Sequence, residues 1–351
     1  MKELSIQERM EYLYQGKTID RVPLITNATL FSGIFARLNS QDFLCNAHNM
    51  YYAQEQTRGL FECHGAPSFC HTNWLAECFG ASNKYQETPW GFSVPQIKPV
   101  ICSESDAESL SCPPLEGQFV LELRQNFIDT ARANGRKMVG VTAGSVVEIA
   151  AQITKTNLFM NWLKKNPKLI YHICNVITEF LLKLIDRDIA KYGAENCTAL
   201  FFYPLESHEI MSPDLLNKFS WPYIFDMHKI LQEKGIRNFS EHLCGSQNNN
   251  LPVYKELKIP ARACFSLDER TDLKLASRIL GCEHIIMGNV NTCILATGTA
   301  QQVFEKCREI LNIGKGCEGG FILSPSCDLP PNTPPLNLYA MQRAVRQYGK
   351  Y

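Results

Sequence analysis

Histidine and cysteine residues in the last third of the chain could bind a metal ion. His242 and Cys244 lie two residues apart at the end of a predicted strand, residues 238–243, and Gly245 follows them. Side chains two apart along a strand point the same way, so the imidazole and the thiolate could face one point together. Gly245 would allow the chain to turn close to that point.

Cys327 is a third candidate ligand, because it follows the last predicted strand, residues 320–323. One imidazole with two thiolates suits zinc, and three protein ligands leave a position open, as in catalytic zinc sites. The spacing alone leaves an alternative equally open. In that alternative, His242 is a hydrogen-bonded core histidine, and Cys244 and Cys327 are small buried apolar residues.

Two Cys-His pairs flank another predicted strand, residues 66–70. They are Cys63-His64 and Cys70-His71. Their spacing matches no standard metal site, so we interpret them as core or mouth-lining residues, with metal binding as the minor alternative.

Two polar residues after other predicted strands could line a pocket. Glu206 lies in a polar segment, residues 206–209, which could equally be a loop with a capping role. Asn289 lies in a Gly-Asn-Val sequence that offers a side-chain amide but is also typical of a turn.

Short apolar runs alternate with longer helical patterns along the chain. The clearest helical pattern is residues 167–191, where Ile173, Ile177 and Phe180 form one stripe. Strands are predicted at residues 23–28, 66–70, 137–142, 198–203, 238–243, 261–266, 284–287 and 320–323. Eight strands that alternate with helices predict an α/β fold, a (β/α)8 TIM barrel in one domain, residues 1–351. A doubly wound sheet is the alternative. In a barrel the fifth and eighth strands end at one mouth, so their metal ligands can meet.

Two regions lie outside the repeating pattern. Helices predicted at residues 5–15 and 46–61 form an N-terminal helical extension. Residues 74–125 fit no repeat unit, and we interpret them as an insertion near the barrel mouth.

Composition excludes several classes of partner. There are 35 Lys and Arg residues and 35 Asp and Glu residues, and no basic stretch alternates with aromatic residues, so nucleic acid is not expected. The polar start, residues 1–16, and the absence of a long apolar stretch predict a cytoplasmic protein with no membrane contact. Fifteen irregularly spaced cysteines indicate free thiols rather than a disulfide framework, with an anaerobic host as a hypothesis.

With these motifs, the chain resembles the uroporphyrinogen decarboxylase superfamily. It is most similar to the zinc-dependent corrinoid methyltransferases within it, which include enzymes that transfer methyl from methylcobalamin to coenzyme M. The similarity is densest at residues 241–245, 265–268, 287–290, 319–323 and 326–334. Zinc-binding members carry His-x-Cys and a distant cysteine, and the resemblance assigns these positions to His242, Cys244 and Cys327. Ser326 departs from the glycine that the family often has there.

The resemblance implies a zinc-dependent methyltransferase. Methyl would move between a methyl-Co(III) corrinoid and a zinc-activated thiol such as coenzyme M. The corrinoid would arrive on a partner protein, because the chain lacks an Asp-x-His-x-x-Gly cobalamin-ligating motif. Glu206 and Asn289 would then face the substrate or the corrinoid.

Three alternatives remain. The enzyme could demethylate a methoxy or methylamine donor and load the corrinoid protein, with zinc as a Lewis acid. A non-catalytic barrel could bind a corrinoid protein. A uroporphyrinogen decarboxylase is disfavoured, because residues 24–30 carry no positive charge for substrate carboxylates.

Overall fold

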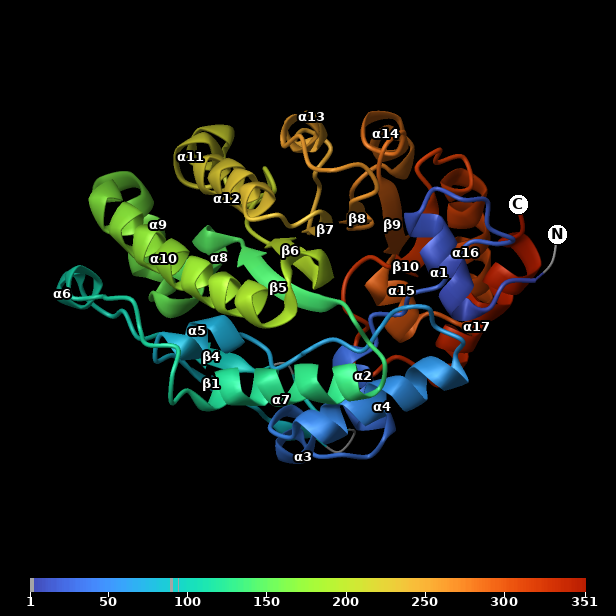
Figure 1. Ribbon diagram of the computed structural model, residues 1–351, viewed down its shortest axis with the longest axis horizontal. Helices are drawn as coiled ribbons and strands as arrows, with labels where there is room; N and C mark the ends of the chain where they lie inside the picture. The colour runs from blue at the N-terminus through green and yellow to red at the C-terminus, as the bar shows by residue number, and fades with distance from the viewer. Residues whose placement is uncertain (1–2, 89–90, 94) are drawn as a thin grey trace. The chain divides into compact units, whose positions relative to one another are not determined.

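The computed structural model describes residues 3–88, 91–93 and 95–351 (Figure 1). Within these residues, the chain divides into two compact units that are each assembled from separate segments. The first unit holds the N-terminal segment up to Asn39, then Asn49–Ser68 and Ser240–Tyr351. The second unit holds Ser40–His48 and Phe69–Phe239. The sections below describe each unit by itself.

Parallel strands connected by helices form the sheet of the first unit. Neighbouring strands pair in the order β7, β8, β9, β10, which are Asn238–Leu243, Cys264–Leu267, Ile285–Val290 and Phe321–Pro325. The helices between and after them are α13 (Leu251–Glu256), α14 (Leu273–Ile279), α15 (Thr292–Thr297), α16 (Ala300–Gly314) and α17 (Pro335–Tyr348). Parallel neighbours need such crossover helices. The last four predicted strands are therefore confirmed, with their ends shifted by a few residues.

The predicted first strand, residues 23–28, is reduced to an isolated parallel bridge between Leu24 and Leu323. Two backbone hydrogen bonds flank it, from Ile25 to the Leu323 carbonyl (2.9 Å) and from Leu323 to the Pro23 carbonyl (2.9 Å). A strand is thus present only as this bridge beside β10, and the predicted length is wrong. Pro23 has no N–H to extend the ladder, and Asn27 leaves the extended conformation with a φ of 44°.

The strand predicted at residues 66–70 is wrong. The Gln54 side chain on α4 (Ala47–Leu60) accepts from the Ser68 N–H (3.0 Å) and donates to the Ser68 carbonyl (2.8 Å). A side chain thus satisfies backbone groups that a neighbouring strand would otherwise pair with. Pro67 also lacks a donor for a ladder.

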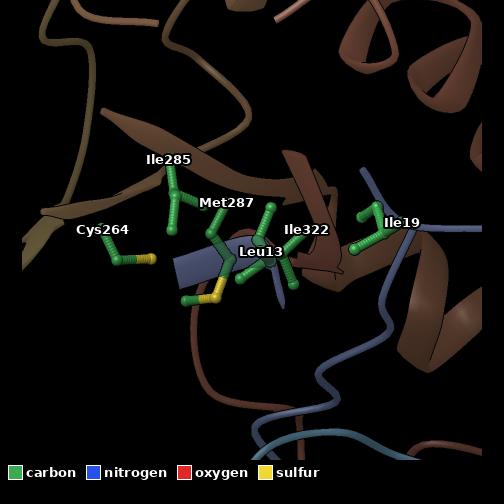
Figure 2. Close-up of a cluster of buried hydrophobic side chains, with 6 residues drawn as sticks. All are labelled: Leu13, Ile19, Cys264, Ile285, Met287 and Ile322. Carbon is green, nitrogen blue, oxygen red and sulfur yellow. The ribbon is translucent and has the colours of Figure 1, made fainter. Parts of the chain in front are cut away.

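The N-terminal helical extension packs against the strands of the first unit. Helix α1 (Ile6–Tyr14) begins with a capping box in which Ser5 and Glu8 bond each other's backbone N–H. Its Leu13 joins a buried cluster with Ile19 and side chains from β8, β9 and β10, namely Cys264, Ile285, Met287 and Ile322 (Figure 2). Further helices in the N-terminal region are α2 (Thr29–Phe35) and α3 (Ser40–Leu44).

The second unit contains a parallel pair of strands, β5 (Val139–Gly144) and β6 (Cys197–Tyr203). Helix α10 (Pro167–Tyr192) lies along β5 and connects the pair, together with α8 (Val146–Ile153) and α9 (Thr156–Lys165) (Figure 1). Its predicted stripe is confirmed, since Ile173, Ile177 and Phe180 are fully buried. Although α10 has 26 residues, no helix in the described ranges is long and apolar enough to cross a membrane.

After β6, the second unit continues with α11 (Pro213–Phe219) and α12 (Trp221–Glu233). Ser212 occupies the N-cap position of α11, but its side chain makes no capping hydrogen bond.

The predicted insertion, residues 74–125, has its own small elements. It contains α5 (Trp74–Cys78), the antiparallel pairs β1 (Ser82–Lys84) with β4 (Gln96–Lys98) and β2 (Glu87–Thr88) with β3 (Gly91–Phe92), and α6 (Glu104–Glu108). The predicted end is too late, because α7 (Phe119–Ala133) already begins at Phe119 and leads into β5.

The close packing of α16 on β10 gives a prediction for stability. A Cβ added at Gly314 would clash with the Phe321 ring, which is fully buried on β10. Gly314→Ala should therefore cost about 1–3 kcal/mol of unfolding free energy, as overpacking does. Urea unfolding followed by circular dichroism measures it.

The matched control is Gly59→Ala in α4, where an added Cβ meets nothing within 4 Å. It should be neutral or stabilise the helix by up to about 1 kcal/mol. Equal stability of Gly314→Ala and the unchanged protein would contradict the packing described here.

Candidate metal centre

Alternate residues of the first unit's strands share one face of the sheet. The strand register places Ser240, Cys264 and Ile285 side by side in one row. The next row toward the carboxyl ends is His242, Ser266, Met287 and Ile322, and the row after that includes Asn289 and Ser324. This face therefore becomes more polar toward the carboxyl ends of the strands, where parallel α/β folds place their chemistry.

His242, Cys244 and Cys327 come together at this end. One donor atom from each lies within 4.8 Å of the other two, and this is the one such group among the described residues. Ligands of a tetrahedral zinc lie about 3.5–4 Å apart, so small side-chain movements would suffice to bind one ion. None of the three residues is fully buried, which leaves the group accessible to a small molecule.

Electrostatics in this group favour a thiolate beside a charged imidazole. A hydrogen bond from Cys244 lowers the pKa of Cys327 far below its usual value, against the effect of burial, and His242 lowers it further. Burial disfavours a charged His242, but a hydrogen bond to Cys327 and the charges of Cys327, Asp328 and Asp268 raise its pKa. A cation could replace the imidazole proton, because the surroundings already compensate positive charge.

Ser266 is a residue that the sequence analysis missed. Its Oγ lies 3.1 Å from Nδ1 of His242, and it is buried on the neighbouring strand. If His242 bound a metal in this arrangement, it would do so through Nε2. The signal was a polar residue at the end of the apolar strand predicted at residues 261–266, but its pairing with His242 depends on strand register.

Asn289 supports the loop that follows β8. Its amide donates to the carbonyls of Asp268 and Thr271, both at 3.2 Å. Asp268 is further tied to Arg270. Burial alone would raise the pKa of Asp268, but hydrogen bonds from Arg270 and the Gly245 backbone lower it overall. The predicted role of Asn289 toward substrate stays a prediction.

Glu206 belongs to the second unit and is fully buried. Its carboxylate accepts hydrogen bonds from Ser145 (2.6 Å) and Ser220 (2.7 Å). Burial raises the pKa of Glu206 despite these hydrogen bonds. Burial, and then the charge of Glu206, raise the pKa of Glu148 to about 8. Glu148 therefore tends to retain its proton near neutral pH, and the predicted contact of Glu206 with substrate stays a prediction.

The two Cys-His pairs make internal contacts. His64 bonds Arg9 (2.8 Å) and the Leu24 backbone, and burial together with Arg9 lowers its pKa to about 4. Cys63 accepts from the Thr26 N–H at 3.2 Å. His71 pairs with Glu77 at 2.9 Å. Cys63, His64 and His71 are buried, whereas Cys70 is partly exposed.

Every cysteine of the chain lies in the described ranges and is a free thiol. The expectation that the thiols form no disulfide framework therefore agrees with the structure.

Two curated proteins are similar to part of the chain. The chain is 28% identical over 162 residues to a methylcobamide:CoM methyltransferase, MtbA, of Methanosarcina acetivorans. It is 27% identical over 162 residues to MtbA of Methanosarcina mazei. Each alignment covers 45% of this chain, and the chain spans only 45% of each relative.

A solved structure extends the similarity to the whole fold. A methyltransferase from Methanosarcina mazei matches with a TM-score of 0.77 at 19% identity, over 99% of both chains. The predicted (β/α)8 class is confirmed by this match and by a family model, Uroporphyrinogen decarboxylase (URO-D), which matches residues 6–348. The chain belongs to the uroporphyrinogen decarboxylase (URO-D) family.

Proposed function

We propose that this protein is a zinc-dependent methyltransferase. It moves a methyl group between a methyl-Co(III) corrinoid, carried by a partner protein, and a thiol such as coenzyme M. The observation that carries the proposal is the gathering of His242, Cys244 and Cys327 at the carboxyl ends of parallel strands. The similarity to methylcobamide:CoM methyltransferases supports the corrinoid and the thiol as substrates.

The residues present fit a zinc ion. One imidazole and two thiols are the donor set of zinc sites that keep a position open. With Nδ1 in contact with Ser266, Nε2 of His242 would bind the ion, and no further histidine, cysteine or carboxylate joins the group among the described residues. When bound, zinc would act as a Lewis acid that keeps a substrate thiol in its reactive thiolate form.

The protein's own residues then have defined tasks. His242, Cys244 and Cys327 would hold the ion, and the two cysteine thiolates would balance its charge. The substrate sulfur attacks the methyl carbon, so that a sulfur–carbon bond forms as the cobalt–carbon bond breaks. The electron pair of the broken bond stays on cobalt, giving Co(I), and the thiol proton leaves to solvent.

Other residues shape the site in this proposal. Asn289 fixes the loop that carries Asp268 and Thr271, beside the metal ligands. Glu206 acts as a hydrogen-bonded acid that faces substrate or corrinoid. We propose that residues 1–351 work as one domain, in keeping with the family match over residues 6–348.

A methylcobalamin assay tests the proposed reaction. Zinc-loaded protein and methylcobalamin should give cob(I)alamin under anaerobic conditions when a thiol acceptor is added. Absorbance follows the cobalt species, and mass spectrometry identifies the methylated thiol. Coenzyme M and homocysteine are the thiols to compare.

Methoxyarenes and methylamines with cob(I)alamin form the parallel arm of this assay. Two results together would reverse the proposed direction of methyl transfer. One of these donors would methylate cob(I)alamin, and no thiol would demethylate methylcobalamin in fully zinc-loaded protein. Inactivity in both arms would contradict the proposal.

Removal of one ligand tests the metal site. Cys327→Ser should reduce bound zinc from about one ion per chain to a small fraction, and methyl transfer should fall with it. Metal analysis after dialysis against a weak chelator measures zinc. The control is Cys293→Ser, which changes another exposed cysteine on α15 and should keep its zinc. Full zinc and activity in Cys327→Ser would show that the ligand set is wrong.

Zinc affinity should depend on pH in a defined direction. The pKa of His242 is raised above 6.5, so a proton competes with the metal for the imidazole at and below this raised pKa. The zinc dissociation constant should therefore stay low above the raised pKa and rise as pH falls through it. Competition with a chromophoric chelator between about pH 5.5 and 8 measures this. A constant affinity across that range would contradict a histidine ligand.

A further inference from the structure

We propose that Ser266 is a positioning residue that fixes the ring orientation of His242 for metal binding. The inference deepens the proposed function, because it rests on a metal at His242, Cys244 and Cys327. It assigns a task to a side chain that would not touch the metal or the substrate.

The contact is built into the strand ladder. Ser266 is the direct register partner of His242 on adjacent parallel strands, so both side chains leave the same face of the sheet. Its Oγ lies 3.1 Å from Nδ1 of His242. Only 2% of Ser266 is exposed, so water cannot easily replace its hydroxyl.

The hydroxyl holds the Nδ1 side of the ring. A hydroxyl can donate to Nδ1 or accept from Nδ1–H, so it fits the ring with or without a proton on that nitrogen. If Nε2 binds a metal, Nδ1 carries the proton and donates a hydrogen bond to Oγ. Without Oγ, one of the contacts that orient the ring is lost, and metal binding would have to select the productive orientation.

Two carboxylates, Asp328 and Asp268, act on His242 through their charges and not through a hydrogen bond. Asp268 lies two residues beyond Ser266, but its Oδ1 accepts from the Arg270 guanidinium and the Arg270 N–H, both at 3.0 Å. A hydroxyl acceptor adds no charge, whereas the carboxylate that often supports a metal-binding histidine makes the ring more basic. Two thiolates would already reduce the positive charge of the ion. A neutral hydrogen-bond partner for His242 would therefore leave the ion better able to polarise a substrate thiol than a carboxylate partner would.

The experiment compares Ser266→Ala with Ser266→Thr, which keeps the hydroxyl. The control is Ser277→Ala in α14, whose hydroxyl contacts Cys317 in the same unit. The readouts are the zinc dissociation constant, the absorption spectrum of cobalt(II)-substituted protein, and kcat and KM for methyl transfer. Thermal unfolding checks that each variant folds.

Ser266→Ala should bind zinc about 10–100-fold more weakly, as loss of such a supporting contact usually does. Its cobalt(II) spectrum should change, and kcat should fall more than KM rises. Ser266→Thr should restore affinity and spectrum, and Ser277→Ala should match the unchanged protein. Unaltered zinc affinity and cobalt spectrum in folded Ser266→Ala would overturn the inference.

The two proposals fail in different ways. If zinc binding depends on Ser266 but no methyl transfer occurs in the unchanged protein, the positioning role holds and the proposed reaction is wrong. If methyl transfer occurs and Ser266→Ala changes neither zinc affinity nor spectrum, the reaction holds and the positioning role is wrong.

Discussion

The register of the parallel strands β7 to β10 is the constraint on which the rest of the first unit depends. Because side chains alternate between the two faces, a shift of one residue would turn every side chain of a strand to the opposite face. His242 would then leave the face that it shares with Ser266, and the apolar row around Cys264 and Ile285 would lose its contacts with Leu13. One set of backbone hydrogen bonds thus positions both the core and the candidate metal centre.

Cys327, like Cys244, lies in a loop beyond the end of a strand. Backbone hydrogen bonds hold this loop on both sides of the thiol. The Ser326 N–H donates to the Val290 carbonyl (2.9 Å), and the Leu329 N–H donates to the Asn27 carbonyl (3.0 Å). The first of these bonds continues the pairing of β9 with β10. The position of Cys327 therefore depends on the same set of strand pairings that positions His242.

Sequence patterns predicted the parts of this protein that depend on local periodicity. The α10 stripe and the later strands were accessible because apolar residues recur at helical or strand spacing. The strand at residues 66–70 failed because Gln54, a distant side chain, takes the backbone groups of Ser68. The candidate metal ligands could be proposed from spacing and resemblance. The contact of Ser266 with His242 could not, because the sequence of each strand alone does not determine the register between them.

The order of the segments has a consequence for biosynthesis. The first unit begins with the N-terminal segment and ends with Ser240–Tyr351, and the whole of Phe69–Phe239 is made in between. Asn27 and Ser324, which share a hydrogen bond, are 297 residues apart in sequence. The N-terminal segment therefore cannot form its contacts with residues 240–351 until these have been synthesised. The second unit can already collapse before then. Such long-range closure slows folding, so the complete group of His242, Cys244 and Cys327 can form only after Cys327 has been made.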